Sequence, residues 1–143
     1  MTAITLALAN QLIAATQAHV AAHKLKPLCI AVFDARGVLV AYAGTDGAPL
    51  MRWKIACGKA YGALAFGAGS RRLGVMAVER PHFTGALTLL ADGGMVPVAG
   101  GVLIKDASGA VLGAVGTSGD TSDNDEAAAA AAIISVGLVA DGG

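Results

Sequence analysis

Two histidines on one segment are the first residues whose types and spacing allow chemistry. His19 and His23 lie four residues apart within a stretch of helical periodicity, so both side chains can face the same way. Two histidines alone make an incomplete zinc site, and no other His, Cys or acid pattern completes it. His19 lies on an apolar helix face, where a histidine is either a hydrogen-bonded structural residue or an axial haem ligand.

A glycine-rich turn followed by acidic residues is the second feature of interest. The segment GAVLGAVGTSGDTSDNDEAAAAAA (109–132) superficially resembles a phosphate-binding loop that leads into a helix. However, Asp120 stands where a Walker loop has its lysine. Asp123, Asp125 and Glu126 already compensate the positive end of the helix dipole. The segment therefore predicts a tight glycine turn and a capped helix, which suit a flat or uncharged ligand better than a nucleotide.

Basic residues gather in the middle of the chain. They predict a charged outer face or salt bridges between subunits, or alternatively a site for carboxylate or propionate groups. No G-x-S-x-G elbow, no nucleophilic cysteine with its histidine and no acid pair accompanies them. The residues concerned are Arg52, Lys54, Lys59, Arg71, Arg72 and Arg80, with Glu79 among them.

Length and composition limit the classes of function. The chain has 143 residues, which suits a single domain over 1–143. Ten acidic residues balance ten basic ones, so we expect no nucleic-acid partner. The sequence shows no secretory signal and no apolar run of about eighteen residues, so we expect a cytoplasmic protein without a membrane span. We expect Cys29 and Cys57 to be buried free thiols.

The elements that position these residues follow the order helix, two strands, two or three helices, three strands, helix. Because the strands come in adjacent groups and not singly between helices, this order predicts an α+β fold with an antiparallel sheet. The predicted helices cover 2–23, 50–66, 70–78, 82–91 and 122–140, and the predicted strands cover 28–34, 38–44, 95–101, 102–109 and 110–116.

Several segments together resemble the GlcG/HbpS family of haem-degrading or haem-binding domains. This family includes the C-terminal domain of PduO-type corrinoid adenosyltransferases. The resemblance covers nearly the whole chain, and its specificity comes from the order and spacing of the motifs. The matching segments are IAVFDARGVLVAYAGTDGAPL (30–50), KAYGA (59–63), GGMVPV (93–98) and GAVLGAVGTSGDTSDNDEAAAAA (109–131).

The resemblance implies a profilin-like fold, in which helices pack on the faces of a five-stranded antiparallel sheet. It also implies self-association to a dimer or octamer. Some members of the family bind haem through a histidine of the first helix and others through a threonine. In this chain His19 occupies the helix-one position, and Thr117 is the threonine candidate.

Three hypotheses about function follow from these observations. The first, which the resemblance favours, is a haem-binding or haem-handling protein in which His19 ligates the iron. The second is a cofactor-independent lyase or isomerase for a small carboxylated or carbonyl metabolite, with Lys59 and Asp125 as the acid–base pair. The third is a structural oligomer that supports a partner enzyme. In the second hypothesis the further substrate-binding residues are Asp34, Gly94, Pro97 and Thr117.

Overall fold

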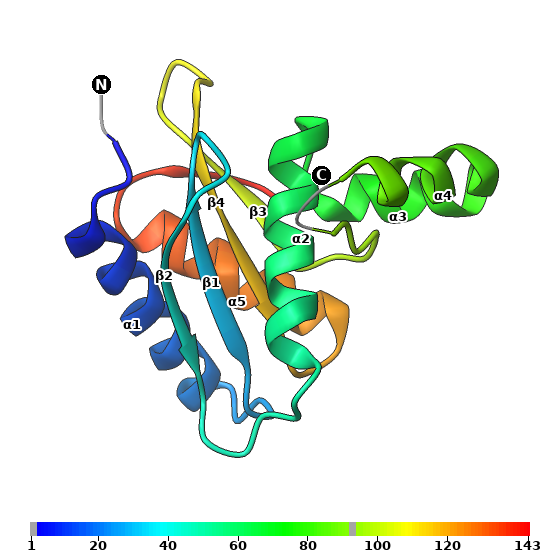
Figure 1. Ribbon diagram of the computed structural model, residues 1–143. Helices are drawn as coiled ribbons and strands as arrows, with labels where there is room; N and C mark the ends of the chain where they lie inside the picture. The colour runs from blue at the N-terminus through cyan, green and yellow to red at the C-terminus, as the bar shows by residue number, and fades with distance from the viewer. Residues whose placement is uncertain (1–2, 92–93) are drawn as a thin grey trace.

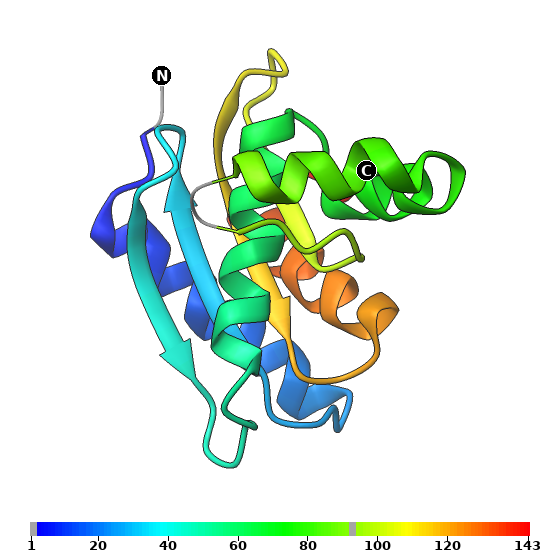
Figure 2. The same cartoon turned by 45° about the vertical axis from the view of Figure 1, so that its right-hand side comes forward.

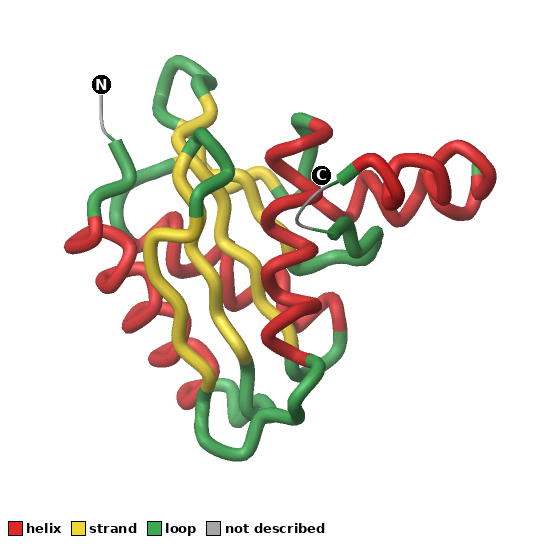
Figure 3. Tube along the Cα trace, in the orientation of Figure 1, coloured by secondary structure: helices red, strands yellow, loops and turns green. Residues whose placement is uncertain are grey.

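A five-stranded antiparallel sheet forms the centre of the molecule (Figure 3). The computed structural model describes residues 3–91 and 94–143. The strand order across the sheet is β2-β1-β4-β3-β5, so the two ends of the chain contribute neighbouring central strands. The strands are β1 (Cys29–Asp34), β2 (Leu39–Gly44), β3 (Gly101–Lys105), β4 (Val111–Ser118) and β5 (Val139–Asp141).

Helices cover both faces of this sheet. Figure 1 shows α1 (Leu6–Ala22) and α5 (Ser122–Ser135) on one face and α2 (Arg52–Phe66) on the other. The remaining helices, α3 (Ser70–Glu79) and α4 (Pro81–Leu90), form a hairpin that extends away from the sheet (Figure 2). The resulting α+β architecture agrees with the fold class predicted from the sequence.

The core lies on both faces of β1, whose apolar residues are all buried. Ile30 and Val32 belong to the larger hydrophobic cluster beneath α1 and α5, whereas Ala31 and Phe33 belong to a smaller cluster beneath α2. This alternation is what a strand with period two produces when helices cover both faces of the sheet. It explains why the run CIAVF is continuously apolar and not alternating.

The two hairpins of the sheet close with the same kind of turn. Asp34 and Asp106 each begin a D-A-x-G tetrapeptide, and each carboxylate accepts hydrogen bonds from the backbone N–H two and four residues later. Gly37 and Gly109 end these turns with φ of 80° and 87°, values that favour glycine. Local sequence therefore fixes both hairpins.

Two predicted elements are wrong. The predicted strand 95–101 is a loop through Gly100, and Gly101 already begins β3. Pro97 cannot donate a ladder hydrogen bond, and Gly100 has a φ of 127°. The predicted helix 122–140 ends at Ser135, and Gly137 takes a φ of 80° shortly after it. The chain then adds the short edge strand β5 to the sheet.

Other boundaries differ by a few residues, and part of the predicted end of α4, at Asp92 and Gly93, lies outside the described residues. Cys29 and Cys57 are free thiols as predicted, but only Cys29 is buried, whereas Cys57 is half-buried. None of the helices in the described part of the chain combines the length and the hydropathy needed to cross a bilayer.

Candidate functional site

A buried ion pair and a hydrogen bond bring together three of the residues that the sequence analysis selected, Lys59, Asp125 and Thr117. The Lys59 ammonium, on α2, lies 3.1 Å from Oδ2 of Asp125 at the start of α5. It also donates a hydrogen bond of 2.9 Å to the carbonyl oxygen of Thr117 on β4. Only 1% of either charged side chain is exposed. The cluster therefore connects both helical layers with the central strand β4.

Close backbone approaches allow the lysine to reach this position. Helix α2 passes directly over β4, and a Cβ at Gly116 would overlap the carbonyl oxygen of Ala56. A Cβ at Gly100 would lie 2.7 Å from the Lys59 ammonium. Glycine at these two positions thus provides the space in which the Lys59 side chain crosses from its helix to Asp125.

The remaining hydrogen bonds of the cluster hold the turn after β4. Asp125 accepts a bond of 2.9 Å from the backbone N–H of Asp120 at Oδ1 and a longer one of 3.4 Å from that of Gly119 at Oδ2. The Thr117 hydroxyl lies 2.7 Å from the carbonyl oxygen of Asp125 and 3.1 Å from that of Gly100. The Asp125 carboxylate therefore binds the backbone N–H groups of the glycine turn that a phosphate would otherwise bind.

Burial lowers the pKa of the Lys59 ammonium, and the nearby Asp125 carboxylate partly offsets this shift. The positive charge of Arg52 lowers this pKa further. A lysine with a lowered pKa beside a carboxylate is chemically suited to proton transfer. In this conformation, however, the pair is closed to substrate because both side chains are buried, so its catalytic role stays a prediction.

His19 lies elsewhere, on the C-terminal half of α1, on the sheet face opposite α2 (Figure 1). Its imidazole stacks on that of His23 with ring centroids 3.9 Å apart. Partial burial, and then the neighbouring charge of His23, lower the pKa of His19. The lowered pKa favours the neutral imidazole, which is the form of histidine that binds a metal ion. Thr117, by contrast, is fully buried and its hydroxyl is already hydrogen bonded.

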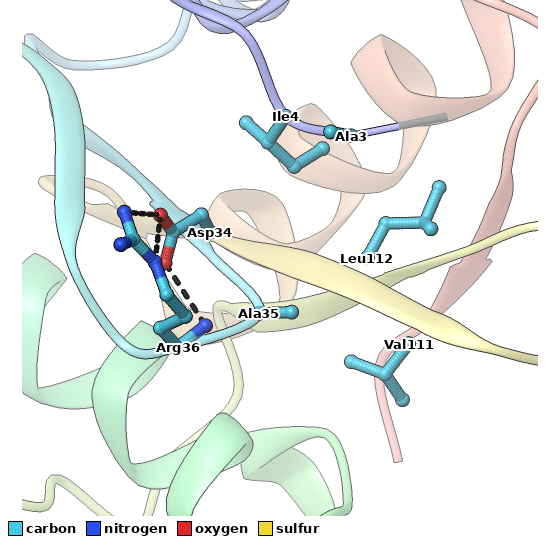
Figure 4. A pocket seen from close by; sticks show the side chains of 7 residues that line it. All are labelled: Ala3, Ile4, Asp34, Ala35, Arg36, Val111 and Leu112. Carbon is cyan, nitrogen blue, oxygen red and sulfur yellow. Dashed lines mark hydrogen bonds and ion pairs between the residues drawn. The ribbon is translucent and has the colours of Figure 1, made fainter. Parts of the chain in front are cut away.

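Asp34 lies at the rim of a cavity of about 400 Å³, but its carboxylate is occupied by its own turn (Figure 4). It accepts hydrogen bonds from the backbone N–H groups of Arg36 and Val38, at 2.9 and 3.1 Å. The Arg36 guanidinium pairs with its second oxygen at 2.8 Å and is the main reason that the pKa of Asp34 is lowered. Asp34 is thus a residue that stabilises the hairpin and does not lie with Lys59.

Gly94 and Pro97 lie in the loop between α4 and β3. Gly94 has a φ of 76°, and Pro97 borders a groove of about 480 Å³ between this loop, α3 and the start of α5. Arg71 spans the same region and pairs with Asp123 and Glu126 of α5. The six residues predicted for the enzymatic site therefore fall into three places, of which only the Lys59 cluster unites more than two of them.

Two polar residues near the cluster were not assigned to the enzymatic site from the sequence, although Arg52 was named among the basic residues in the middle of the chain. The Arg52 guanidinium donates to the Ser118 hydroxyl at 3.2 Å, and so connects the first turn of α2 to the end of β4. Ser118 belongs to the same Gly-Thr-Ser-Gly turn as Thr117, which was a usable signal. The contact of Arg52 with Ser118 had no such signal, because it depends on how α2 crosses the sheet.

Comparisons with known proteins agree with this fold. Three similar crystal structures cover most of the chain. A PduOC–haem complex has 22% identity and a TM-score of 0.84, over 96% of this chain and 97% of its own. HbpS has 24% identity and a TM-score of 0.81, over 95% and 92%. The ORFY protein of Klebsiella pneumoniae has 25% identity and a TM-score of 0.81, over 94% and 91%.

A search of curated proteins found no match. The model of the family described as haem degrading protein HbpS-like, however, matches residues 4–134. This match includes the whole of α1, the four long strands and nearly all of α5. The chain therefore belongs to the HbpS-like family of haem degrading proteins.

Proposed function

We propose that this protein binds haem and takes part in haem handling, with His19 as the iron ligand. Membership in the HbpS-like family over residues 4–134 is the observation that carries the proposal. The PduOC structure, a haem complex with the same fold, supports it further.

The residues around His19 fit the chemistry of haem. Histidine ligates haem iron through a neutral ring nitrogen, and the lowered pKa of His19 favours this neutral form. When bound, haem supplies a redox-active iron centre. Lys24 and Lys26 follow α1 on the exposed surface and offer cations for the propionates. Leu25 and Val20 pack nearby against the core, so the end of α1 is firmly held.

A second copy of the chain completes the site in this proposal. His19 and His23 lie on the outer part of α1 and not inside a deep cavity. A porphyrin bound there exposes its other face unless another surface covers it, and exposed apolar area of that size is costly in water. Self-association to a dimer or octamer provides such a surface.

A haem titration of the purified protein tests this proposal. We expect a Soret band that saturates at micromolar haem in the wild type and is lost in His19→Ala. His23→Ala is the matched control, because it removes the stacked neighbour on the same helix and leaves the proposed ligand in place. A flat titration of the wild type, or an unchanged Soret band in His19→Ala, would contradict the proposal.

A further inference from the structure

A cavity of about 330 Å³ opens between the end of β2, the start of α2 and the loop that joins them, at the lower end of the sheet in Figure 1. Its walls carry two aromatic side chains, Tyr42 and Trp53, which are 40% and 43% exposed. Pro49 and Leu50 continue the apolar wall, and the buried Cys29 forms the floor. Sites for small molecules are hollows of this kind, mostly apolar and aromatic with a few polar groups.

Tyr42 forms its part of the wall because a glycine leaves room for its ring. A Cβ added to Gly44 would lie 3.0 Å from the Tyr42 hydroxyl oxygen and 3.7 Å from its ring, so the ring lies over this glycine. Gly44 is the ladder partner of Cys29, so the three residues share one face of the sheet. This face is the one beneath α2, because Ala31 and Phe33, two and four residues after Cys29, pack there.

A guanidinium lies beside the floor of this cavity. Arg52 donates a hydrogen bond of 3.2 Å to the Ser118 hydroxyl, and Ser118 is the ladder partner of Cys29. Opposed residues of an antiparallel pair have Cβ atoms about 5 Å apart, so the Arg52 guanidinium is a close neighbour of Cys29. The bond to Ser118 uses one of the N–H donors of the guanidinium and leaves the others. Within the described residues, no carboxylate pairs with Arg52.

The charges around Arg52 leave an excess of one positive charge. Arg52 lies close enough to Lys59 to add to the lowering of the Lys59 pKa by burial, and Asp125 supplies one carboxylate against these two cations. The first turn of α2 adds positive potential, because it contains no acidic residue and has no side-chain cap. Asp46, at the rim of the cavity, is exposed, so solvent and salt screen its charge. One bound negative charge beside Arg52 therefore balances the excess.

We propose that this cavity binds a small aromatic monocarboxylate. The ring of the ligand packs against Trp53 and Tyr42, and its carboxylate pairs with Arg52, whose planar N–H donors match the two carboxylate oxygens. The size agrees, because a cavity of about 150 Å³ already holds a benzene ring and small-molecule pockets begin at about 300 Å³. A phosphate ester carries more charge than the single excess, and Arg52 repels a cation.

This site is separate from the two sites described above. His19 belongs to α1, on the sheet face opposite α2 (Figure 1). Lys59 and Asp125 are buried and do not line the cavity. The inference therefore goes beyond haem binding and does not depend on it.

Titration of the purified protein with benzoate tests the site. Trp53 is the only tryptophan of the chain, so its fluorescence reports directly on the cavity. We expect a saturable change with benzoate and none with acetate, which lacks the ring, or with benzylamine, which carries the opposite charge. Isothermal titration calorimetry measures Kd independently. The absence of a saturable response to benzoate, or a response to acetate, benzylamine or phenyl phosphate that equals it, would overturn the proposal.

Substitutions assign the two parts of the ligand to residues. We expect Arg52→Gln to raise the Kd for benzoate roughly 10–100-fold, because the carboxylate loses its charge-assisted hydrogen bonds. Arg72→Gln is the matched control, since Arg72 is an exposed arginine of α3 that does not line the cavity, and it is expected to keep the wild-type Kd. Tyr42→Ala retains the guanidinium and is expected to raise Kd roughly 3–10-fold through the lost ring contact. Circular dichroism checks that each variant is folded, and wild-type affinity in Arg52→Gln or in Tyr42→Ala would contradict the proposed contacts.

Two further variants distinguish a bound anion from a general effect on the fold. Asp46→Asn removes a negative charge from the rim and is expected to lower Kd roughly 2-fold, whereas a weaker affinity in this variant would contradict an anionic ligand. His19→Ala is expected to bind benzoate as the wild type does, and loss of the response there would overturn the assignment to this cavity. A Soret band without a benzoate response refutes only this site, and a benzoate response without a Soret band refutes only haem binding.

Discussion

At the scale of single residues, Lys59 and Asp125 form an ion pair in which both side chains are almost fully buried. Taking both charges out of water is costly, and each charge is tolerated because the other is present. Because burial lowers the pKa of Lys59, keeping this lysine charged costs stability at every pH below that folded-state pKa. The cost diminishes as the pH rises through the folded-state pKa toward the ordinary value of lysine.

Removing one residue of this ion pair tests how much the pair matters for the stability of the fold. We expect Lys59→Met to lower the free energy of unfolding by about 3–5 kcal/mol, because Asp125 is left buried without a countercharge. Urea denaturation monitored by circular dichroism measures this. Lys54→Met is the control, because Lys54 is an exposed residue of the same helix, and it is expected to change stability by less than about 0.5 kcal/mol. A Lys59→Met protein as stable as the control would contradict the structural role.

The half-buried carboxylate of Asp120 connects secondary-structure elements that are far apart in the sequence. Asp120, in the turn before α5, accepts a hydrogen bond of 2.8 Å from the backbone N–H of Lys26 in the α1–β1 loop. It also accepts one of 2.8 Å from the Asn124 side chain. These bonds, with that from Lys26 as the largest cause, lower the pKa of Asp120 to about 2. The carboxylate thus holds the loop after α1 against the start of α5.

The hydrogen bonds of the Asp120 carboxylate predict that the stability of the fold decreases at acidic pH. The folded-state pKa of Asp120 lies below its ordinary value of 3.8, so its contribution is complete above that value and is lost as the pH falls toward 2. We expect Asp120→Asn to lower Tm at pH 6, and the difference from wild type to shrink on acidification to pH 2. Scanning calorimetry checks this. Asp46→Asn, which removes a charge from the exposed loop after β2, is expected to leave Tm at pH 6 unchanged.

The elements that sequence could predict are those defined by local signals. The D-A-x-G turns at Asp34 and Asp106 determine both hairpins, and the acidic segment marks the start of α5, although the residue that caps this helix is Thr121. Strand β5 was not predicted, because three residues directly after a helix are too few to show a strand pattern in the sequence. Its pairing with β3 depends on the tertiary structure. The loop around Pro97 was predicted as a strand because its residues are apolar. These residues pack against α2 and α3 and form no strand ladder.

For the molecule as a whole, the sequence predicted the α+β class and placed Lys59, Thr117 and Asp125 in one site. It could not show that this site is closed, because burial depends on how α2 and α5 meet across β4. It also grouped Asp34 and Pro97 with these residues, although the turn geometry directs the Asp34 carboxylate to its own backbone. A resemblance to a family matches motifs along the sequence, but it does not show which side chains are already hydrogen bonded within the protein.

Haem binding is expected to stabilise the whole fold, because a ligand that binds only the native state raises the free energy of unfolding. At free haem about 100-fold above Kd the gain is about 2.7 kcal/mol, which corresponds to a rise in Tm of roughly 5–10 °C for a domain of this size. Differential scanning fluorimetry measures the shift, which His23→Ala is expected to keep and His19→Ala to lose. An equal shift in both variants would place the ligand away from His19.

The strand order has a consequence for synthesis on the ribosome. β1 pairs with β2 as soon as the first hairpin emerges, but its other edge pairs with β4, which is translated near the end of the chain. Until then the nascent chain carries a strand that is apolar from Cys29 to Phe33 and has one open edge, an arrangement that is prone to aggregation. The open edge of β1 is therefore covered only after β3 and β4 have been translated.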